Sequence, residues 1–154
     1  TTDDALKRIH FLKHVIEDKG GHHLFYHQGK PLTKEEDIHI MYKLTWFASP
    51  SDVTSEANDG RGPVDFKISR GSKDKTLVEF KLASNSQLKR NLEKQLEVYK
   101  KASDASVGFS VILYFSASEQ QKVETILKSL DLVGNRHIIL IDAGSVNKPS
   151  GSKA

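Results

Sequence analysis

The chain has 154 residues, no cysteine and a formal net charge of +3, so it has room for one domain of ordinary size and not for two. Because cysteine is absent, disulfides and thiolate metal sites are excluded, and we expect a reducing compartment, the cytoplasm. No apolar run approaches the roughly 18 residues that cross a bilayer, and the first residues lack the basic and apolar parts of a signal peptide, so we expect no membrane partner.

Two helical patterns occupy the first third of the chain. Apolar residues at helical spacing predict a helix from Asp3 to about Asp18, and Gly20 and Gly21 end it. A histidine-rich connector follows. The capping box Thr33-x-x-Glu36 then predicts a second helix that ends before Pro50. Three strands are predicted next, at about residues 51–57, 63–70 and 75–82.

The second half alternates helices with buried strands. After a helix at about residues 87–102, an apolar run at 107–115 rich in β-branched and aromatic residues predicts a strand buried on both faces. The motif Ser118-x-x-Gln121 is expected to cap a helix that ends near residue 130, and a last buried strand follows at 137–141.

This order of elements predicts an α/β fold with a central mixed sheet of about five strands flanked by helices. We expect one domain over residues 1–143. The tail over residues 144–154 has the composition of a linker and is expected to be flexible.

The hairpin VDFKISRGSKDKTLVEFK, residues 64–81, alternates apolar and polar side chains in both strands. If its turn centres near Ser72, the apolar faces coincide, Asp65 lies opposite Glu79, and Lys81 shares their face. A slip of one residue would oppose apolar and polar faces, whereas a slip of two would keep the faces and only offset the carboxylates. Both carboxylates and the lysine share one face either way.

Two like charges opposed across a sheet are destabilising by roughly 0.2–1 kcal/mol, so we expect something to compensate them. Mg²⁺ suits the position, because it prefers oxygen ligands and is often held by one or two carboxylates, here with the backbone carbonyl of Phe80. Such an ion lowers the pKa of a bound water, which a lysine can orient. The alternative is an ion pair of Lys81 with Asp65 or Glu79 on an exposed face.

Asp65 followed by Glu79-Phe80-Lys81 resembles the signature of the PD-(D/E)XK nuclease superfamily, and Gly62-Pro63-Val64-Asp65 resembles its lead-in. One helix further on, Gln95-x-x-x-Tyr99 resembles the QxxxY motif of the RecB-like branch. The order helix, three-stranded meander, helix, strand is similar to the core of that family, so the resemblance covers about residues 33–115.

The resemblance implies a restriction-endonuclease-like fold and a site for Mg²⁺ or Mn²⁺ at Asp65 and Glu79. It also implies catalytic roles for Lys81, Gln95 and Tyr99. The pattern agrees for Gln95, which lies on the apolar stripe of its helix, where a polar amide needs a partner.

The family also uses an acidic residue from the helix before the sheet. Glu36 matches by resemblance, although its place in a capping box explains it without chemistry. Asp37 is favoured by geometry, because it precedes Ile40 and Met41 by one helical turn. Glu56 on the first predicted strand is a further option.

Residues 61–101 hold eleven Lys or Arg against five Asp or Glu, so the basic part of the chain surrounds the hairpin. The side chains that flank the expected site can hold a phosphate backbone or can equally be solvated surface residues. They are Arg61, Lys67, Ser84, Asn85, Lys89 and Arg90.

We therefore expect a Mg²⁺-dependent enzyme that hydrolyses DNA phosphodiester bonds, with Asp65 and Glu79 binding the metal and Lys81 positioning the attacking water. The alternatives are a catalytically inactive nuclease-fold domain that binds nucleic acid or another partner, and an RNA nuclease. DNA is the expected partner. Other possible partners are a second copy of the chain, in a homodimer, and an upstream domain of a longer protein, since the chain begins without Met.

Overall fold

The computed structural model describes the chain except for residues 32–34, 47–50, 59–62, 72–73, 101–105 and 147–154. Its helices are α1 Thr2–Asp18, the short 3-10 helix η1 Gly21–Phe25, α2 Glu35–Leu44, α3 Leu88–Lys100 and α4 Ala117–Ser129. Its strands are β1 Tyr26–His27, β2 Lys30–Pro31, β3 Asp52–Asn58, β4 Pro63–Ser69, β5 Lys75–Leu82, β6 Ser106–Tyr114 and β7 Ile138–Asp142.

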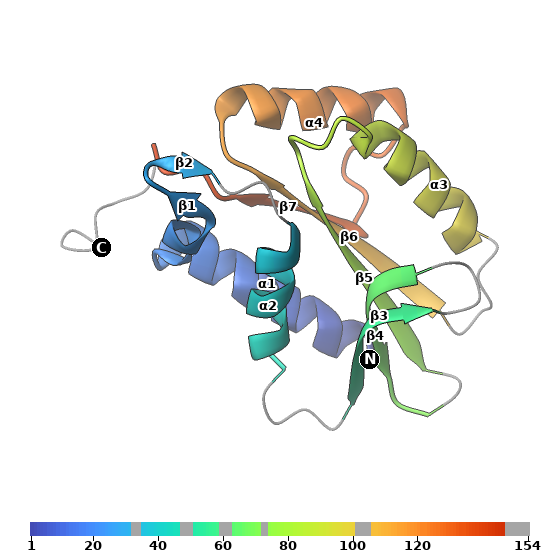
Figure 1. The fold of residues 1–154 in the computed structure, drawn as a ribbon. Coiled ribbons are helices and arrows are strands. Elements are labelled where there is room, and N and C mark those ends of the chain that lie inside the picture. Colours follow the sequence, from blue (N-terminus) through green and yellow to red (C-terminus); the bar gives the residue numbers. More distant parts are fainter. Residues whose placement is uncertain (32–34, 47–50, 59–62, 72–73, 101–105, 147–154) are drawn as a thin grey trace.

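Five strands form one mixed sheet in the order β3-β4-β5-β6-β7 (Figure 1). The first three form an antiparallel meander. Strands β5, β6 and β7 run parallel, because α3 and α4 each return the chain to the same end of the sheet. The α/β class and the mixed sheet expected from the sequence are confirmed.

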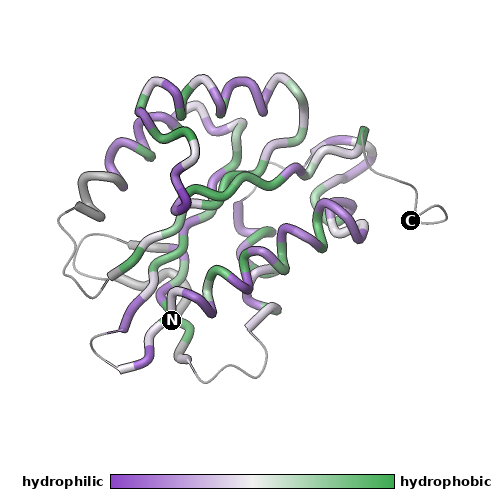
Figure 2. The backbone as a smooth tube through the Cα atoms, turned by 180° about the vertical axis from the view of Figure 1, so that it is seen from behind, coloured by the Kyte–Doolittle hydropathy of each residue, from purple (hydrophilic) through white to green (hydrophobic). Residues whose placement is uncertain are grey.

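Helices cover both faces of the sheet, with α1 and α2 on one side and α3 and α4 on the other (Figure 1). The α1/α2 side buries a large aromatic and aliphatic core. A smaller core lies under α3 and α4. The central strands between these cores consist mainly of hydrophobic residues (Figure 2). None of the helices in the described residues has the length and apolar character needed to span a membrane.

The histidine-rich connector contains a small hairpin that the sequence did not predict. Tyr26 pairs with Pro31 and His27 with Lys30. The two residues between the strands, Gln28 and Gly29, both have positive φ, at 51° and 77°. Two successive positive φ values are what a two-residue hairpin turn requires, and glutamine is an unusual residue for it, so the pattern gave no signal.

The predicted cap of α4 is wrong by two residues. Ser116, not Ser118, is the N-cap, and its side chain accepts a hydrogen bond from the N–H of Glu119 at 3.2 Å. Glu119 in turn accepts from the N–H of Phe115 at 2.8 Å. This reciprocal pair is available only when the helix starts after Ser116. The cap predicted at Thr33 lies outside the described residues.

Candidate functional site

The β4–β5 hairpin has the predicted register. Phe66 pairs with Val78, which excludes the slips of one and two residues. This is the last backbone pair of the ladder. Beyond it, the N–H of Phe80 donates to Asp65 Oδ2 at 2.7 Å. Continued by one residue, the register brings Asp65 opposite Glu79, as expected.

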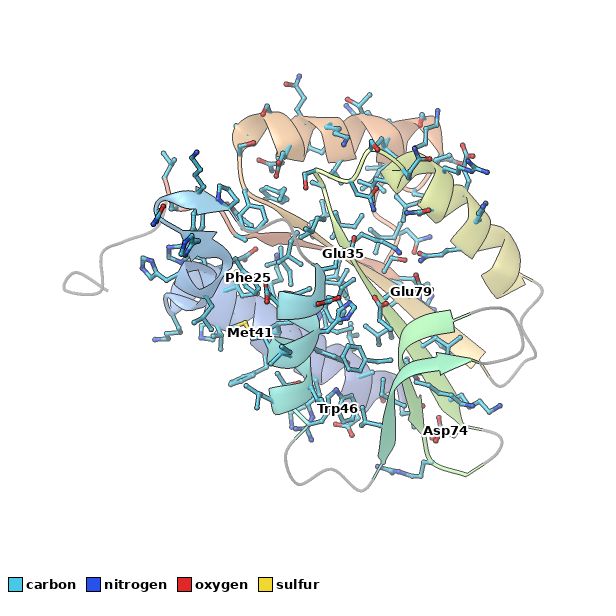
Figure 3. The ribbon with its side chains drawn as sticks, in the orientation of Figure 1. Phe25, Glu35, Met41, Trp46, Asp74 and Glu79 are labelled. Carbon is cyan, nitrogen blue, oxygen red and sulfur yellow. The ribbon has the colours of Figure 1, made fainter. Side chains whose placement is uncertain are left out.

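A carboxylate from α2 reaches the same edge of β5. Glu35 Oε1 accepts a hydrogen bond from the N–H of Leu82 at 3.3 Å. The N–H groups of Phe80 and Leu82, two residues apart, are therefore both bonded by side-chain carboxylates where the pairing with β4 has ended. Figure 3 labels Glu35 on α2 and Glu79 on the neighbouring strand β5.

The two acidic residues of α2 expected at the site, Glu36 and Asp37, do not make the contact with β5 that Glu35 makes. Glu36 is exposed and Asp37 is half-buried. Neither has a hydrogen bond or ion pair with another described residue, whereas Glu35, one position earlier, contacts β5. Since each helical residue turns the side chain by about 100°, an error of one position points to a different face of the helix.

His39 also joins the site, and sequence reasoning missed it. Its Nε2 lies 3.2 Å from Asp65 Oδ2. The imidazole packs edge-on against the ring of Phe66, with centroids 5.7 Å apart, and tilted against Phe80 at 5.8 Å. The available signal was its spacing, because His39 is four residues after Glu35 and therefore on the same side of α2.

Glu79 is the most buried charged group of the site, with 9% of the residue exposed. Lys81 Nζ lies 3.4 Å from its Oε2, and Gln95 Nε2 donates to the same oxygen. Burial raises the pKa of the Glu79 carboxyl above its ordinary value; Lys81 opposes this, and the nearby charges of Asp65 and Glu35 add to it. Burial of the carboxyl, more than its neighbouring charges, therefore favours the protonated form of Glu79.

The side chain of Gln95, on α3, links strands β5 and β6 by hydrogen bonds. Its carbonyl oxygen accepts a hydrogen bond from Ser110 Oγ on β6 at 2.8 Å, while its amide nitrogen bonds Glu79 on β5. The polar residue on the apolar stripe of α3 thus has its partners in the expected site. Ser110 was not predicted, although a single serine inside the apolar run of β6 was a signal.

Some expected residues lie outside the described part of the structure. Arg61 is one, and the side chain of Tyr99 on α3 is another. Glu56 lies on β3 between two pairs, Ser55 with Phe66 and Ala57 with Val64. Its backbone position is therefore opposite Asp65, and its side chain is outside the described residues.

The remaining expected nucleic-acid contacts surround the site on β4, the loop after β5, and α3. Lys67 is half-buried on β4, and Ser84, Lys89 and Arg90 are exposed. Asn85 has a local role, because its side chain accepts a hydrogen bond from the N–H of Gln87 at 2.9 Å. This bond shapes the turn that leads into α3.

The donor set fits a hard divalent cation. Asp65 and Glu79 use only Oδ2 and Oε2 in the contacts above, so each carboxylate retains an oxygen without a hydrogen bond to another described residue. Mg²⁺ and Mn²⁺ accept such oxygens and leave other positions to water and phosphate. No three His, Cys, Asp or Glu side chains of the described residues lie close enough together to form a metal site by themselves. Water and substrate would have to supply several ligands.

These features define an α/β protein with paired carboxylates and a lysine on two adjacent inner strands of a mixed sheet. The chain belongs to the family described as Domain of unknown function (DUF8371), whose model matches residues 1–117. The match includes every residue of the site and ends at the first residue of α4. No curated protein matches the chain. No solved structure matches it either.

Proposed function

We propose that this protein is a metal-dependent nuclease of the PD-(D/E)XK type that hydrolyses DNA phosphodiester bonds. The observation that carries the proposal is the meeting of Asp65, Glu79 and Lys81 on adjacent strands, in the register that their spacing requires. A restriction-endonuclease-like fold is part of the proposal. It is supported by the antiparallel meander followed by a crossover helix and a parallel strand.

Each of the three residues would have a separate role in the reaction. Asp65 and Glu79 would hold Mg²⁺ or Mn²⁺, which when bound supplies a water of lowered pKa and neutralises charge on the phosphate. Lys81 lies near enough to Glu79 to donate to a water or phosphate oxygen held beside that carboxylate. The water oxygen adds to phosphorus, the bond from phosphorus to the leaving sugar oxygen breaks, and that oxygen takes up a proton.

A domain that binds nucleic acid without cutting it is the second candidate. One observation favours it, namely that the described His, Asp and Glu residues do not by themselves form a three-ligand cluster. The alignment of Lys81 with both carboxylates favours catalysis, because a binding domain has no need of that combination.

The two candidates differ in a cleavage assay. Purified protein is incubated with supercoiled plasmid, linear duplex, single-stranded DNA and RNA, each with Mg²⁺, Mn²⁺ or EDTA. We expect DNA to be cut with either metal and not in EDTA. The variants Glu79→Gln and Lys81→Met should lose about 10²-fold or more in rate, as when one group that stabilises transition-state charge is removed.

Matched controls are Glu93→Gln on α3 and Lys128→Met on α4, which make the same chemical changes at exposed positions. Both should cut at the wild-type rate. Equal rates in the wild type and the two site variants, or cleavage in EDTA, contradict the proposed site. Salt-sensitive DNA binding without cleavage would favour the binding domain. Cleavage of RNA and not of DNA would identify RNA as the substrate.

A further inference from the structure

Strand β6 carries a buried polar side chain next to the site. Ser110 is 5% exposed and is the register partner of Glu79 on the parallel strand β5. Paired positions on neighbouring strands project to the same face of a sheet, so the hydroxyl and the carboxylate lie side by side. This is the α3 side, since the adjacent inward residue of β6, Ile112, packs with Leu88 and Leu92 of α3.

Gln95 spans this pair of strands with the two ends of one amide. Its Oε1 accepts from Ser110 Oγ at 2.8 Å, and its Nε2 donates to Glu79 Oε2. A glutamine amide can be rotated to exchange oxygen and nitrogen, and its partners decide which end faces which group. With the ends exchanged, the amide oxygen would face the Glu79 carboxylate and repel it.

We infer that Ser110 is a positioning residue, which acts through Gln95 to fix the orientation of the Glu79 carboxylate. By donating to the carbonyl end of the amide, Ser110 directs the N–H end at Glu79 Oε2. The other carboxylate oxygen, Glu79 Oε1, is then oriented to bind a metal ion. The effect on metal binding rests on the proposed function, whereas the orientation of the amide does not.

The test uses Mn²⁺ alone as the probe, with binding followed by electron paramagnetic resonance in the full chain. Ser110→Ala should weaken Mn²⁺ binding about 10-fold, the lower end of the losses seen when a partner of a metal ligand is removed. Ser110→Thr keeps the hydroxyl and should restore binding to near the wild-type value. Thr76→Val is the matched control, because it removes another fully buried hydroxyl, on β5, whose hydrogen-bond partners among the described residues are Thr1 and Thr2.

The route through Gln95 is tested by a double-mutant cycle. In a Gln95→Ala background, Ser110→Ala should cause no further loss of Mn²⁺ affinity, because the group through which it acts is absent. A loss as large as in the wild type would overturn the inference, and so would a failure of Ser110→Thr to restore binding in a variant that remains folded.

A second measurement needs no metal. The side-chain amide protons of Gln95, followed by NMR, should shift in Ser110→Ala and in Glu79→Gln, and should not shift in Thr76→Val. Unchanged shifts in Ser110→Ala would overturn the inference. If the wild type bound no Mn²⁺ but these shifts occurred, the nuclease proposal would fail and the positioning of Glu79 by Ser110 would stand.

Discussion

Glu79 combines burial with charge, and this has a consequence for stability. Its pKa is raised in the folded protein above the ordinary value of 4.5, chiefly by burial, which outweighs the attraction of Lys81, while the charges of Asp65 and Glu35 add to the rise. The folded state therefore favours the protonated carboxyl. Stability from this group is fully present below pH 4.5 and is lost as the pH rises through the higher, folded-state pKa.

Glu79→Gln should consequently stabilise the metal-free protein at neutral pH. The amide has nearly the same shape, can still accept from Gln95, and carries no charge that burial penalises. We expect a higher melting temperature than in the wild type at pH 8, and a difference that shrinks as the pH falls toward 4.5. Thermal unfolding in EDTA across this range measures it. A variant less stable than the wild type at pH 8 would show that Lys81 fully compensates the carboxylate.

Strand β5 needs other partners beyond Val78, because its pairing with β4 ends at the pair of Phe66 and Val78. Asp65 and Glu35 supply acceptors for two consecutive outward N–H groups of the strand, those of Phe80 and Leu82. The same two carboxylates lie close enough to raise the pKa of Glu79. The structural requirement of an unpaired strand edge thus concentrates negative charge at one place.

Glu35 allows this structural role to be separated from its charge. Glu35→Ala removes the acceptor for the Leu82 N–H and should cost about 1 kcal/mol, or roughly 2–4 °C in melting temperature. Glu35→Gln keeps an acceptor oxygen and should unfold near the wild-type temperature. Thermal unfolding of both variants, with exposed Glu36→Ala as the control, decides the matter. Equal losses in the alanine and glutamine variants would mean that the charge, and not the hydrogen bond, matters to stability.

The hairpin was predictable because its side chains alternate strictly, so burial of one face selects the register and with it the opposition of Asp65 and Glu79. Gln95 was predictable because a polar residue on an apolar stripe needs a partner. The acidic residue of α2 that contacts β5, Glu35, was not predictable. Each residue of a helix turns its side chain by about 100°, so the residue that faces the sheet depends on how α2 is placed. Glu35 and His39 became visible only once α2 was placed against β5.

For the whole molecule, the two halves of the sheet have different tasks. The antiparallel half brings together Asp65, Glu79 and Lys81, which are close in sequence. The parallel half adds Ser110, which is distant in sequence and reaches Glu79 through α3. The family match ends at residue 117, so all of these site residues lie within it, whereas most of α4 and all of β7 lie beyond it.

The distribution of charge predicts how DNA binding depends on salt. Residues 61–101 carry a surplus of positive charge, and Lys89 and Arg90 are exposed on α3, the helix that also carries Gln95. If both contact phosphates of duplex DNA, each accounts for about 0.9 in the slope of log K against log salt concentration. Lys89→Ala combined with Arg90→Ala should reduce that slope by about 1.8 and weaken binding at low salt, with little dependence on DNA sequence.

Fluorescence anisotropy with a labelled duplex in EDTA measures this slope without cleavage. Lys128→Ala on α4 is the control, because it removes another exposed positive charge, from outside the basic segment, and should leave the slope unchanged. A double variant with the wild-type slope would place the phosphate contacts elsewhere on the surface. A control that lowers the slope as much per charge would mean that DNA senses only the net charge of the molecule and has no preferred face.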